Sequence, residues 1–493
     1  MKKIFLAFTF IASFFVGCTD LKDEVLDRIP EDQYVVDPVL QMTPIYEPMR
    51  EFLDNGGWWF AQELTSDEMV GPTRASDWDD GGKWRVLHTH TWENNTEAIN
   101  NMWERFNRGV TEANKFLEAQ AQFAGDSVVD AGIAKGKILR AYYYYLLIDN
   151  YGDVPFVTEY LNAPKLPVKE HRDVIWQNIV NDIETGIEKL PPSTSKTAVT
   201  PAMAYALLAK LYLNAEQYTG TSNPDYWVKA EQACDAIIAL GQYSLEANPL
   251  APFVTNNQNS VENIWAIPYD EDNYKGNNLH MRTLHYNSNL TFDMSVGPWN
   301  GFAVTEDHYN TYTENDLRKA YFLVGQQYTS DGKPITDAVA NANLVFTPNI
   351  PALLMDASFT AAQIRMSGAR VAKFEIKKGA KDNLSNDFPI FRYADVLLMK
   401  AEAMIRQGKN GDEFVNMVRV RAGLEPWSGT TLDQILEERG REMFWEAHRR
   451  QDLIRFGKFN DEWWEKPAST PDRKIFPIPQ WAIDANPNLG DNI

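Results

Sequence analysis

Apolar residues recur at three- and four-residue steps over much of the chain before residue 245, the spacing that places them on one face of an α-helix. The clearest stripe consists of Ile99, Met102, Trp103, Phe106, Val110, Ala113, Phe116 and Leu117. Similar patterns predict helices at about 131–150, 172–190, 201–218 and 226–241, and again at 392–407, 412–422 and 432–449. We therefore expect a mainly α fold in which helices pack on helices.

Local signals predict where some of these helices begin. Thr200 precedes Pro201, and a proline fits a first helical position because its missing amide hydrogen is not needed there. Thr431 and Gln434 have the spacing of a capping box at the start of the helix predicted from residue 432.

A weak internal repeat indicates helical hairpins. Three predicted helices place a small residue before two bulky ones at plus three and plus four, in Ala141/Tyr144/Tyr145, Ala209/Tyr212/Leu213 and Ala401/Met404/Ile405. The small residue lets two helices approach closely, and the bulky pair fills the groove of the next hairpin. This predicts a tetratricopeptide-like helical hairpin scaffold. The spacing between the sets is irregular, so the repeat alone indicates hairpins and little more.

The character of the chain changes between about 246 and 390, where Asn, Gly, Pro, Thr and aromatic residues dominate. An alternation over 372–377 predicts one short strand there. We expect a large loop-rich excursion from a scaffold at about 30–245 and 390–460, and excursions of this size are usually functional. No linker or low-complexity tract marks a boundary, so residues 18–493 are predicted to form a single domain.

The charge balance narrows the classes of ligand. The 493 residues include 68 Asp and Glu against 47 Lys and Arg, which gives a formal charge of −21. Such a surface repels phosphate backbones and anionic lipid headgroups, so nucleic acid is not an expected partner. A neutral or cationic ligand suits it better.

The N-terminus predicts export. Lys2 and Lys3 precede an apolar run over residues 4–16, which is the pattern of a signal peptide covering residues 1–17. The run is too short to span a bilayer, because a spanning helix needs about 20 residues.

The residues after this run predict a lipid anchor. Val16-Gly17-Cys18 resembles the end of a bacterial lipobox, although Phe15 replaces the usual Leu, and Cys18 is therefore predicted to be acylated. Lys22-Asp23-Glu24 resembles a short acidic signal that directs bacterial lipoproteins to the cell surface. We expect the protein on the outer membrane, facing outward. The remaining cysteine, Cys234, lies in a helical pattern and is predicted to be a buried small hydrophobe.

Several motifs in a fixed order carry a family resemblance. They are Arg140–Tyr144 leading into Tyr151–Pro155, then Phe391–Leu398 with Ala401–Ala403, then Glu438, Arg439, Glu442, Glu446, Arg449, Asp452, Leu453 and Arg455, and finally Pro477–Pro479 and Asn486–Leu489. Together these resemble the SusD/RagB family of surface nutrient-binding lipoproteins, over nearly the whole chain from Cys18 onward. The resemblance implies a SusD-like fold, a glycan ligand and a partner SusC-like TonB-dependent transporter on which the protein sits as a lid.

The polar residues among these motifs are predicted to be structural. Glu437 with Arg441, and Glu446 with Arg450, have the spacing of ion pairs along one helix. Alternatively, Arg439, Glu442, Arg449 and Asp452 form a partly buried network that ties this helix to its neighbours.

Two aromatic-rich segments outside the helices are candidates for ligand contact. A sugar ring has a face of C–H bonds that rests on an aromatic ring, and its hydroxyls need polar partners. The candidate residues are Arg74, Trp78, Asp80, Trp84, Tyr274, Asn277 and Trp299, with Asp80 and Asn277 as the polar partners. Alternatively, several of these aromatics seal loops against the helices. Trp92 and Trp103 are predicted to be core.

The sequence predicts no catalytic residues, cofactor or metal site. The adjacent carboxylates Asp67-Glu68 and Asp79-Asp80 do not suit a glycosidase, whose two carboxyl groups lie about 5–10 Å apart across a bond. His88 and His90 have no matching ligand cluster. We expect a binding protein rather than an enzyme. A tetratricopeptide-type scaffold lipoprotein without a small-molecule site remains the alternative, and a surface glycosidase is a third hypothesis.

Overall fold

The computed structural model describes residues 38–490, which lie in one compact unit. The predicted signal peptide, Cys18 and the acidic residues of 22–24 lie outside the described residues. Within the described part of the chain, no helix is both long and apolar enough to cross a membrane.

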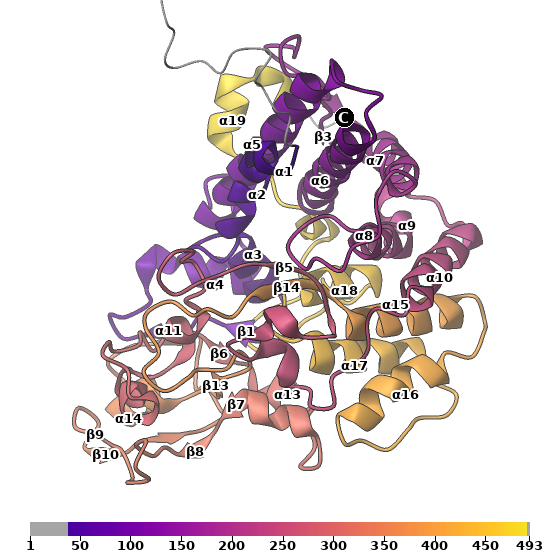
Figure 1. The fold of residues 1–493 in the computed structure, drawn as a ribbon. Coiled ribbons are helices and arrows are strands. Elements are labelled where there is room, and N and C mark those ends of the chain that lie inside the picture. The colour runs from indigo at the N-terminus through magenta and orange to yellow at the C-terminus, as the bar shows by residue number, and fades with distance from the viewer. Residues whose placement is uncertain (1–37, 491–493) are drawn as a thin grey trace, which may run out of the picture. The chain divides into compact units, whose positions relative to one another are not determined.

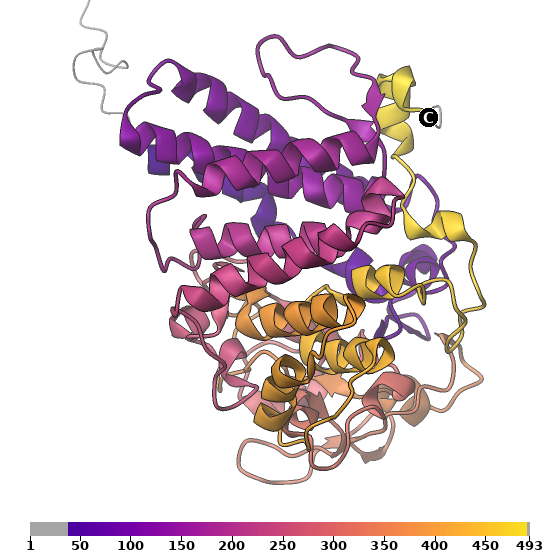
Figure 2. The same cartoon turned by 90° about the vertical axis from the view of Figure 1, so that its right-hand side faces the viewer.

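Helices dominate the first half of the chain. They are α1 (Pro38–Gln41), α2 (Thr43–Arg50), α3 (Trp58–Leu64), α4 (Lys83–His88), α5 (Glu97–Ala121), α6 (Ser127–Tyr151), α7 (Arg172–Ile187), α8 (Pro201–Leu213), α9 (Ala215–Thr219) and α10 (Pro224–Ala239). The longer of these helices pack against one another in sequence, α5 on α6, α6 on α7 and α8 on α10. Figure 2 shows them as successive rows from purple to magenta. The mainly α prediction is confirmed.

Small residues lie at the helix contacts, as the repeat predicted. Ala141, Ala209 and Ala401 are each fully buried. Gly109 of α5 faces α6 so closely that an added Cβ would lie 2.2 Å from Cζ of Tyr143. The helices therefore approach at a distance that larger side chains would prevent.

The predicted excursion consists of short helices and paired strands. Its helices are α11 (Leu279–Thr283), α12 (Asn289–Phe292), α13 (Glu306–Tyr309) and α14 (Ala361–Met366). In the described residues every sheet has two strands. Six of the seven described pairs are antiparallel. Five of these six are β3 (Val154–Pro155) with β4 (Lys169–Glu170), which precedes the excursion, β14 (Phe388–Arg392) with β5 (Asn263–Ile267), β13 (Arg370–Val371) with β7 (Phe322–Leu323), β11 (Val345–Phe346) with β8 (Gly325–Gln326), and β10 (Ala342–Asn343) with β9 (Thr336–Asp337).

Two further pairs tie the excursion to the segment before α4. β1 (Met69–Val70) pairs antiparallel with β6 (Ala303–Val304), and β2 (Thr73–Arg74) pairs parallel with β12 (Leu354–Met355). Figure 1 shows β1 and β6 below α4 and beside α11. They bring together the two aromatic-rich segments that the sequence singled out.

The strand predicted at 372–377 is wrong. The strand of this region is β13, which ends at Val371. Phe374 and Ile376 are buried as the alternation requires, but Lys373, directly before Phe374, is also buried. Its ammonium group lies 2.6 Å from a carboxylate oxygen of Glu446, so Lys373 does not lie on a solvent face as the pattern predicted.

The C-terminal helices complete the scaffold. They are α15 (Tyr393–Arg406), α16 (Asp412–Arg421), α17 (Leu432–Met443), α18 (Arg449–Arg455) and α19 (Gln480–Ala485). The capping box of Thr431 and Gln434 is confirmed. The helix predicted over 432–449 ends early, however, because Phe444 has a non-helical ψ of 136°, and Trp445 and Ala447 then have φ angles of +67° and +63°. Left-handed residues cannot continue an α-helix.

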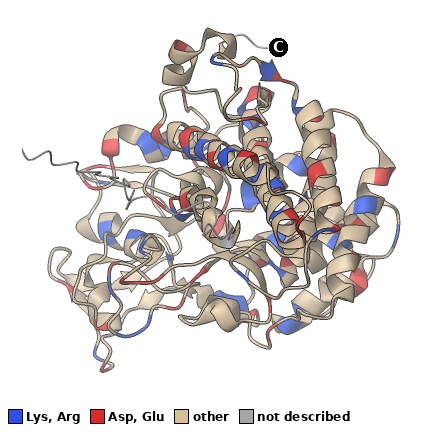
Figure 3. Cartoon of the chain, turned by 45° about the horizontal axis from the view of Figure 1, so that its top comes forward, with Lys and Arg blue, Asp and Glu red and all other residues tan. Residues whose placement is uncertain are grey.

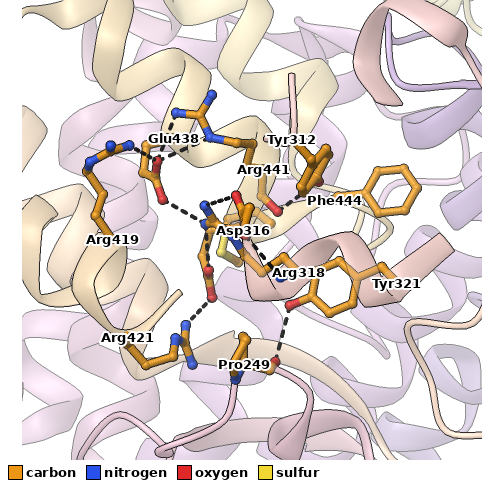
Figure 4. Close-up of polar contacts among 12 residues, drawn as sticks. Pro249, Tyr312, Asp316, Arg318, Tyr321, Arg419, Arg421, Glu438, Arg441 and Phe444 are labelled. Carbon is orange, nitrogen blue, oxygen red and sulfur yellow. Dashed lines mark hydrogen bonds and ion pairs between the residues drawn. The ribbon is translucent and has the colours of Figure 1, made fainter. Parts of the chain in front are cut away.

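Buried ion pairs hold these helices together, as the network prediction expected. Arg439 of α17 lies 2.8 Å from Asp395 and 2.7 Å from Asp452. Figure 4 shows a second cluster, in which Arg318 contacts Asp316 and Glu438, and Arg419 and Arg441 also contact Glu438. All these side chains are buried, so each charge depends on its partners.

One of the two predicted helical pairs is confirmed. Glu437 lies 3.8 Å from Arg441. The pair of Glu446 and Arg450 is wrong, because Glu446 binds Lys373 and Arg392 while Arg450 donates to the carbonyl of Lys474. The turn between α17 and α18 separates the two side chains.

Candidate functional site

An open pocket of about 510 Å³ lies where the two aromatic-rich segments meet. It is lined by Asn55, Asp77, Trp78, Asp80, Trp84, Arg282, Tyr286, Pro298 and Trp299. Four of the predicted ligand residues are therefore brought to one place: Trp78, Asp80, Trp84 and Trp299. We call this cavity the aromatic pocket.

Trp78 and Trp299 are linked to each other. The indole Nε1–H of Trp78 donates to the carbonyl of Trp299 over 2.7 Å. The Trp78 ring also packs on Phe302, with centroids 4.9 Å apart. Gly301 makes this position possible, because an added Cβ there would lie 2.3 Å from Cε2 of Trp78. Trp78 and Trp299 therefore form one wall of the aromatic pocket, and Phe302 packs against this wall.

Trp84 holds a carboxylate at the pocket. The side chain is only 2% exposed, and its Nε1–H donates to Oδ2 of Asp80 over 2.7 Å. Asp80 itself is exposed and has a φ of +42°, a left-handed conformation that Asp tolerates better than most residues. Trp84 therefore acts mainly by fixing the direction of Asp80.

Arg282 supports Trp299 from behind. Its guanidinium lies 5.2 Å from the ring centroid of Trp299 and 4.7 Å from that of Phe60. Its Nε and Nη1 donate to the side-chain oxygens of Asn278 and Asn55. Burial lowers the pKa of Arg282 to about 10. Trp299 nevertheless keeps 37% of its surface exposed, so one face of the ring is fixed and another part is free for a ligand.

Asp77 and Tyr286 complete the lining. The Tyr286 hydroxyl donates to Oδ2 of Asp77, and the guanidinium of Arg365 lies 4.7 Å from the centroid of the Tyr286 ring. Burial and the Asp77 carboxylate raise the pKa of the Tyr286 hydroxyl to about 12. Tyr286 is therefore a neutral donor at physiological pH.

The other predicted contact residues lie elsewhere. Arg74 is 2% exposed and donates to the carbonyls of Gly301, Ile364 and Ser367. Asn277 is fully buried and donates to the carbonyl of Asn386. Both tie loops together beneath the surface.

Tyr274 is exposed but is not part of the pocket lining. Just over half of its surface, 52%, is exposed, and the guanidinium of Arg50 lies 4.7 Å from its ring centroid.

Residues predicted to be core are confirmed. Trp92, Trp103 and Cys234 are each at most 4% exposed. Burial raises the pKa of the Cys234 thiol, which makes it a poor nucleophile.

Three of the groups considered for catalysis or metal binding are engaged in structural contacts. Asp67 pairs with Arg449 at 2.7 Å, and Asp79 pairs with Arg85 at 2.8 Å. His88 is buried, and burial lowers its pKa to about 4. Within residues 38–490 no group of three or more His, Cys, Asp or Glu side chains is placed to hold a metal ion.

Two family models match this chain, one in its N-terminal part and one in its C-terminal part. Residues 47–213 match the family model described as "Starch-binding associating with outer membrane", and residues 362–493 match the model of the SusD family. The starch-binding protein SusD of Bacteroides thetaiotaomicron is 25% identical over 475 residues, covering 87% of this chain and 84% of its own length. The chain belongs to the SusD family.

Other SusD-family proteins agree in sequence and fold. A SusD-like protein of Bacteroides ovatus is 25% identical over 496 residues, covering 94% of this chain and 86% of its own. The crystal structure of a SusD superfamily protein from Parabacteroides distasonis superposes with a TM-score of 0.77 at 20% identity, covering 92% and 98% of the two chains. Surface glycan-binding protein A of Bacteroides thetaiotaomicron, solved with laminarihexaose, gives 0.73 at 21% identity, covering 91% and 97%.

Proposed function

We propose that this SusD-family protein binds a glycan in the aromatic pocket and carries out no chemistry on it. One observation carries the proposal: the fold joins three indole rings, two carboxylates, an amide, a phenol and a guanidinium in the lining of a single open cavity. Indole faces fit the C–H face of a sugar, and the polar groups fit its hydroxyls. The relatives described as starch-binding and glycan-binding proteins support the proposal.

Within this proposal the predicted contact residues have different roles. Trp78, Trp299 and Asp80 contact the glycan, and Trp84 positions Asp80. Arg74 and Asn277 hold the loops that form the pocket wall. Tyr274 is available for a longer glycan that extends beyond the pocket.

A glycan array followed by calorimetry tests the site. We expect the protein to bind at least one oligosaccharide on the array, and Trp299→Ala and Trp78→Ala each to weaken that binding about fivefold or more, since stacking on an aromatic ring contributes about 1 kcal/mol or more. Trp481→Ala is the matched control, because Trp481 is 48% exposed on α19 and does not line the pocket. Wild-type affinity in both pocket variants would remove the site assignment.

We further propose that the protein is a single nutrient-binding domain over residues 18–493, anchored in the outer membrane by acylated Cys18. There it delivers its glycan to a partner SusC-like TonB-dependent transporter. The description of the matching family model, which names starch binding and association with the outer membrane, supports this proposal. Purification of the tagged protein from outer membranes should recover the transporter, and Cys18→Ser should shift the protein to the soluble fraction. A Cys18→Ser protein that remains in the membrane would contradict the anchor.

The alternatives give different results in the same experiments. A protein-interaction scaffold would bind no glycan on the array yet recover a stable protein partner. A glycosidase would release reducing sugar from the bound polymer, which the proposal does not expect.

A further inference from the structure

Two carboxylates at the aromatic pocket lack a cationic partner. Asp77 and Asp80 are both exposed side chains of the pocket lining. Neither forms an ion pair with any residue that the structure describes. Each is instead fixed by a neutral donor, Asp77 by the Tyr286 hydroxyl and Asp80 by the Trp84 indole. We call these two residues the acidic pair.

The nearby cations are engaged by other carboxylates. Arg85 lies 2.8 Å from Asp79, and Arg365 lies 2.5 Å from Asp337. Lys83 lies 3.0 Å from Glu97. These three positive charges are therefore compensated locally.

Arg282 is the one cation of the pocket lining, and it is enclosed. It is 4% exposed, its guanidinium lies between the rings of Phe60 and Trp299, and two of its nitrogens donate to neutral amides. Asp54, close to Arg282, further compensates its charge. The exposed charge of the pocket is thus that of the acidic pair, on a chain whose formal charge is already −21.

We infer that the acidic pair selects neutral glycans and excludes glycans that carry uronate or sulfate groups. This deepens the proposed function and depends on it. A charged group of a bound sugar about 6 Å from one carboxylate, at an effective dielectric constant of about 40, loses about tenfold in affinity. The neutral hydroxyls of a plain sugar instead donate hydrogen bonds to the same carboxylates.

The test compares two oligosaccharides that differ mainly in charge. Calorimetry measures the affinity of the best neutral oligosaccharide from the array and of the same oligosaccharide oxidised to uronate at C6. We expect the oxidised form to bind at least tenfold more weakly at about 0.01 M salt. The ratio should shrink at about 1 M salt, where the screening length falls from about 30 Å to about 3 Å.

The double variant Asp77→Asn/Asp80→Asn should reduce the affinity ratio to within about threefold. Asparagine keeps the oxygens that accept from Tyr286 and Trp84, and it tolerates the left-handed backbone of residue 80. Asp433→Asn is the control, because Asp433 is exposed in the first turn of α17, outside the pocket. If the double variant fails to fold, the two single variants and the salt series on the unchanged protein decide the question.

The outcomes separate the two proposals. An array on which no glycan binds overturns the proposed function. A wild-type protein that binds the oxidised oligosaccharide as well as the neutral one, or a ratio unchanged in the Asn variants, overturns the charge selection while the glycan-binding function stands.

Discussion

Gly301 shows how one missing side chain shapes the aromatic pocket. The Trp78 ring occupies the space that a Cβ at residue 301 would need, at 2.3 Å from the nearest ring atom. The same ring donates a hydrogen bond to Trp299. A change at residue 301 therefore displaces Trp78 directly and affects Trp299 through the hydrogen bond between them.

Gly301→Ala should weaken glycan affinity at least tenfold and cost about 1–3 kcal/mol in stability, because the added methyl group forces Trp78 out of its place. Calorimetry and chemical denaturation measure the two effects. Gly297→Ala is the matched control, since its Cβ would meet only the carbonyl oxygen of Tyr286 at an ordinary 3.6 Å. Equal affinities in the two variants would contradict this account of the wall.

The sequence predicted some pocket residues from their residue types, but it could not predict which other residues each of them contacts. Trp78 and Trp299 are recognisable as aromatics in polar loops, and the structure brings them to one cavity. Arg74 lies in the same segment of the sequence as Trp78, yet its side chain is buried and donates hydrogen bonds to three carbonyls. Arg282 was missed, because only the fold places its guanidinium behind Trp299.

Glu63 is a buried carboxyl whose titration is shifted strongly. Burial, opposed by the backbone N–H of Ala447 and the charge of Lys373, raises its pKa from 4.5 to about 8. A raised carboxyl pKa means that the folded state prefers the protonated form. The associated stability is fully present below pH 4.5 and declines as the pH rises toward 8.

Glu63→Gln should remove this pH dependence. The variant minus wild-type difference in unfolding free energy should grow in favour of Gln by roughly 2–4 kcal/mol between pH 4.5 and pH 8. Denaturation midpoints across that range measure it. A difference that stays constant with pH would show that Glu63 titrates normally.

At the scale of elements, α17 joins its neighbours through charges rather than through an apolar stripe alone. Glu442 lies 3.0 Å from Arg318 and 2.6 Å from Arg392, and it also binds Arg421. These partners come from the excursion, from β14 and from α16. Glu442 therefore connects α17 to three other parts of the chain.

Glu442→Gln should destabilise the protein by about 3–5 kcal/mol, because it leaves buried guanidinium groups without a counter-charge. Glu437→Gln, less than two turns earlier on the same helix, should cost at most about 0.5 kcal/mol, since Glu437 is 60% exposed and 3.8 Å from its partner. Denaturant titration compares the two. A similar loss of unfolding free energy in the two variants would contradict the view that the buried ion pairs hold α17 to its neighbours.

The pattern of apolar residues predicted the long helices well and the turns poorly. The stripe from Ile99 to Leu117 lies within α5, whose bounds are Glu97–Ala121. Nothing in the residue pattern indicates that Trp445 and Ala447 adopt left-handed conformations and divide α17 from α18. That break follows from tertiary contacts, among them the hydrogen bond from the Ala447 N–H to Glu63.

At the scale of the molecule, charges of both signs are distributed over the helices. Figure 3 shows Lys and Arg interspersed with Asp and Glu along them. In this view the acidic residues are not gathered in one place, whereas the acidic pair is a local feature of one pocket. This difference is why substitution of two residues can change ligand choice while the overall charge stays strongly negative.

Trp78 and Trp299 stand 221 positions apart in the chain, so an oligosaccharide held between them acts as a reversible staple across a very long loop. Unfolding must release it, and at a concentration of 100 times its dissociation constant the bound sugar adds about 2.7 kcal/mol to the folded state. Thermal melting should therefore rise by a few degrees with a cognate glycan and stay unchanged with a sugar that the pocket rejects. A simple melting screen can rank ligands before any of them has been labelled.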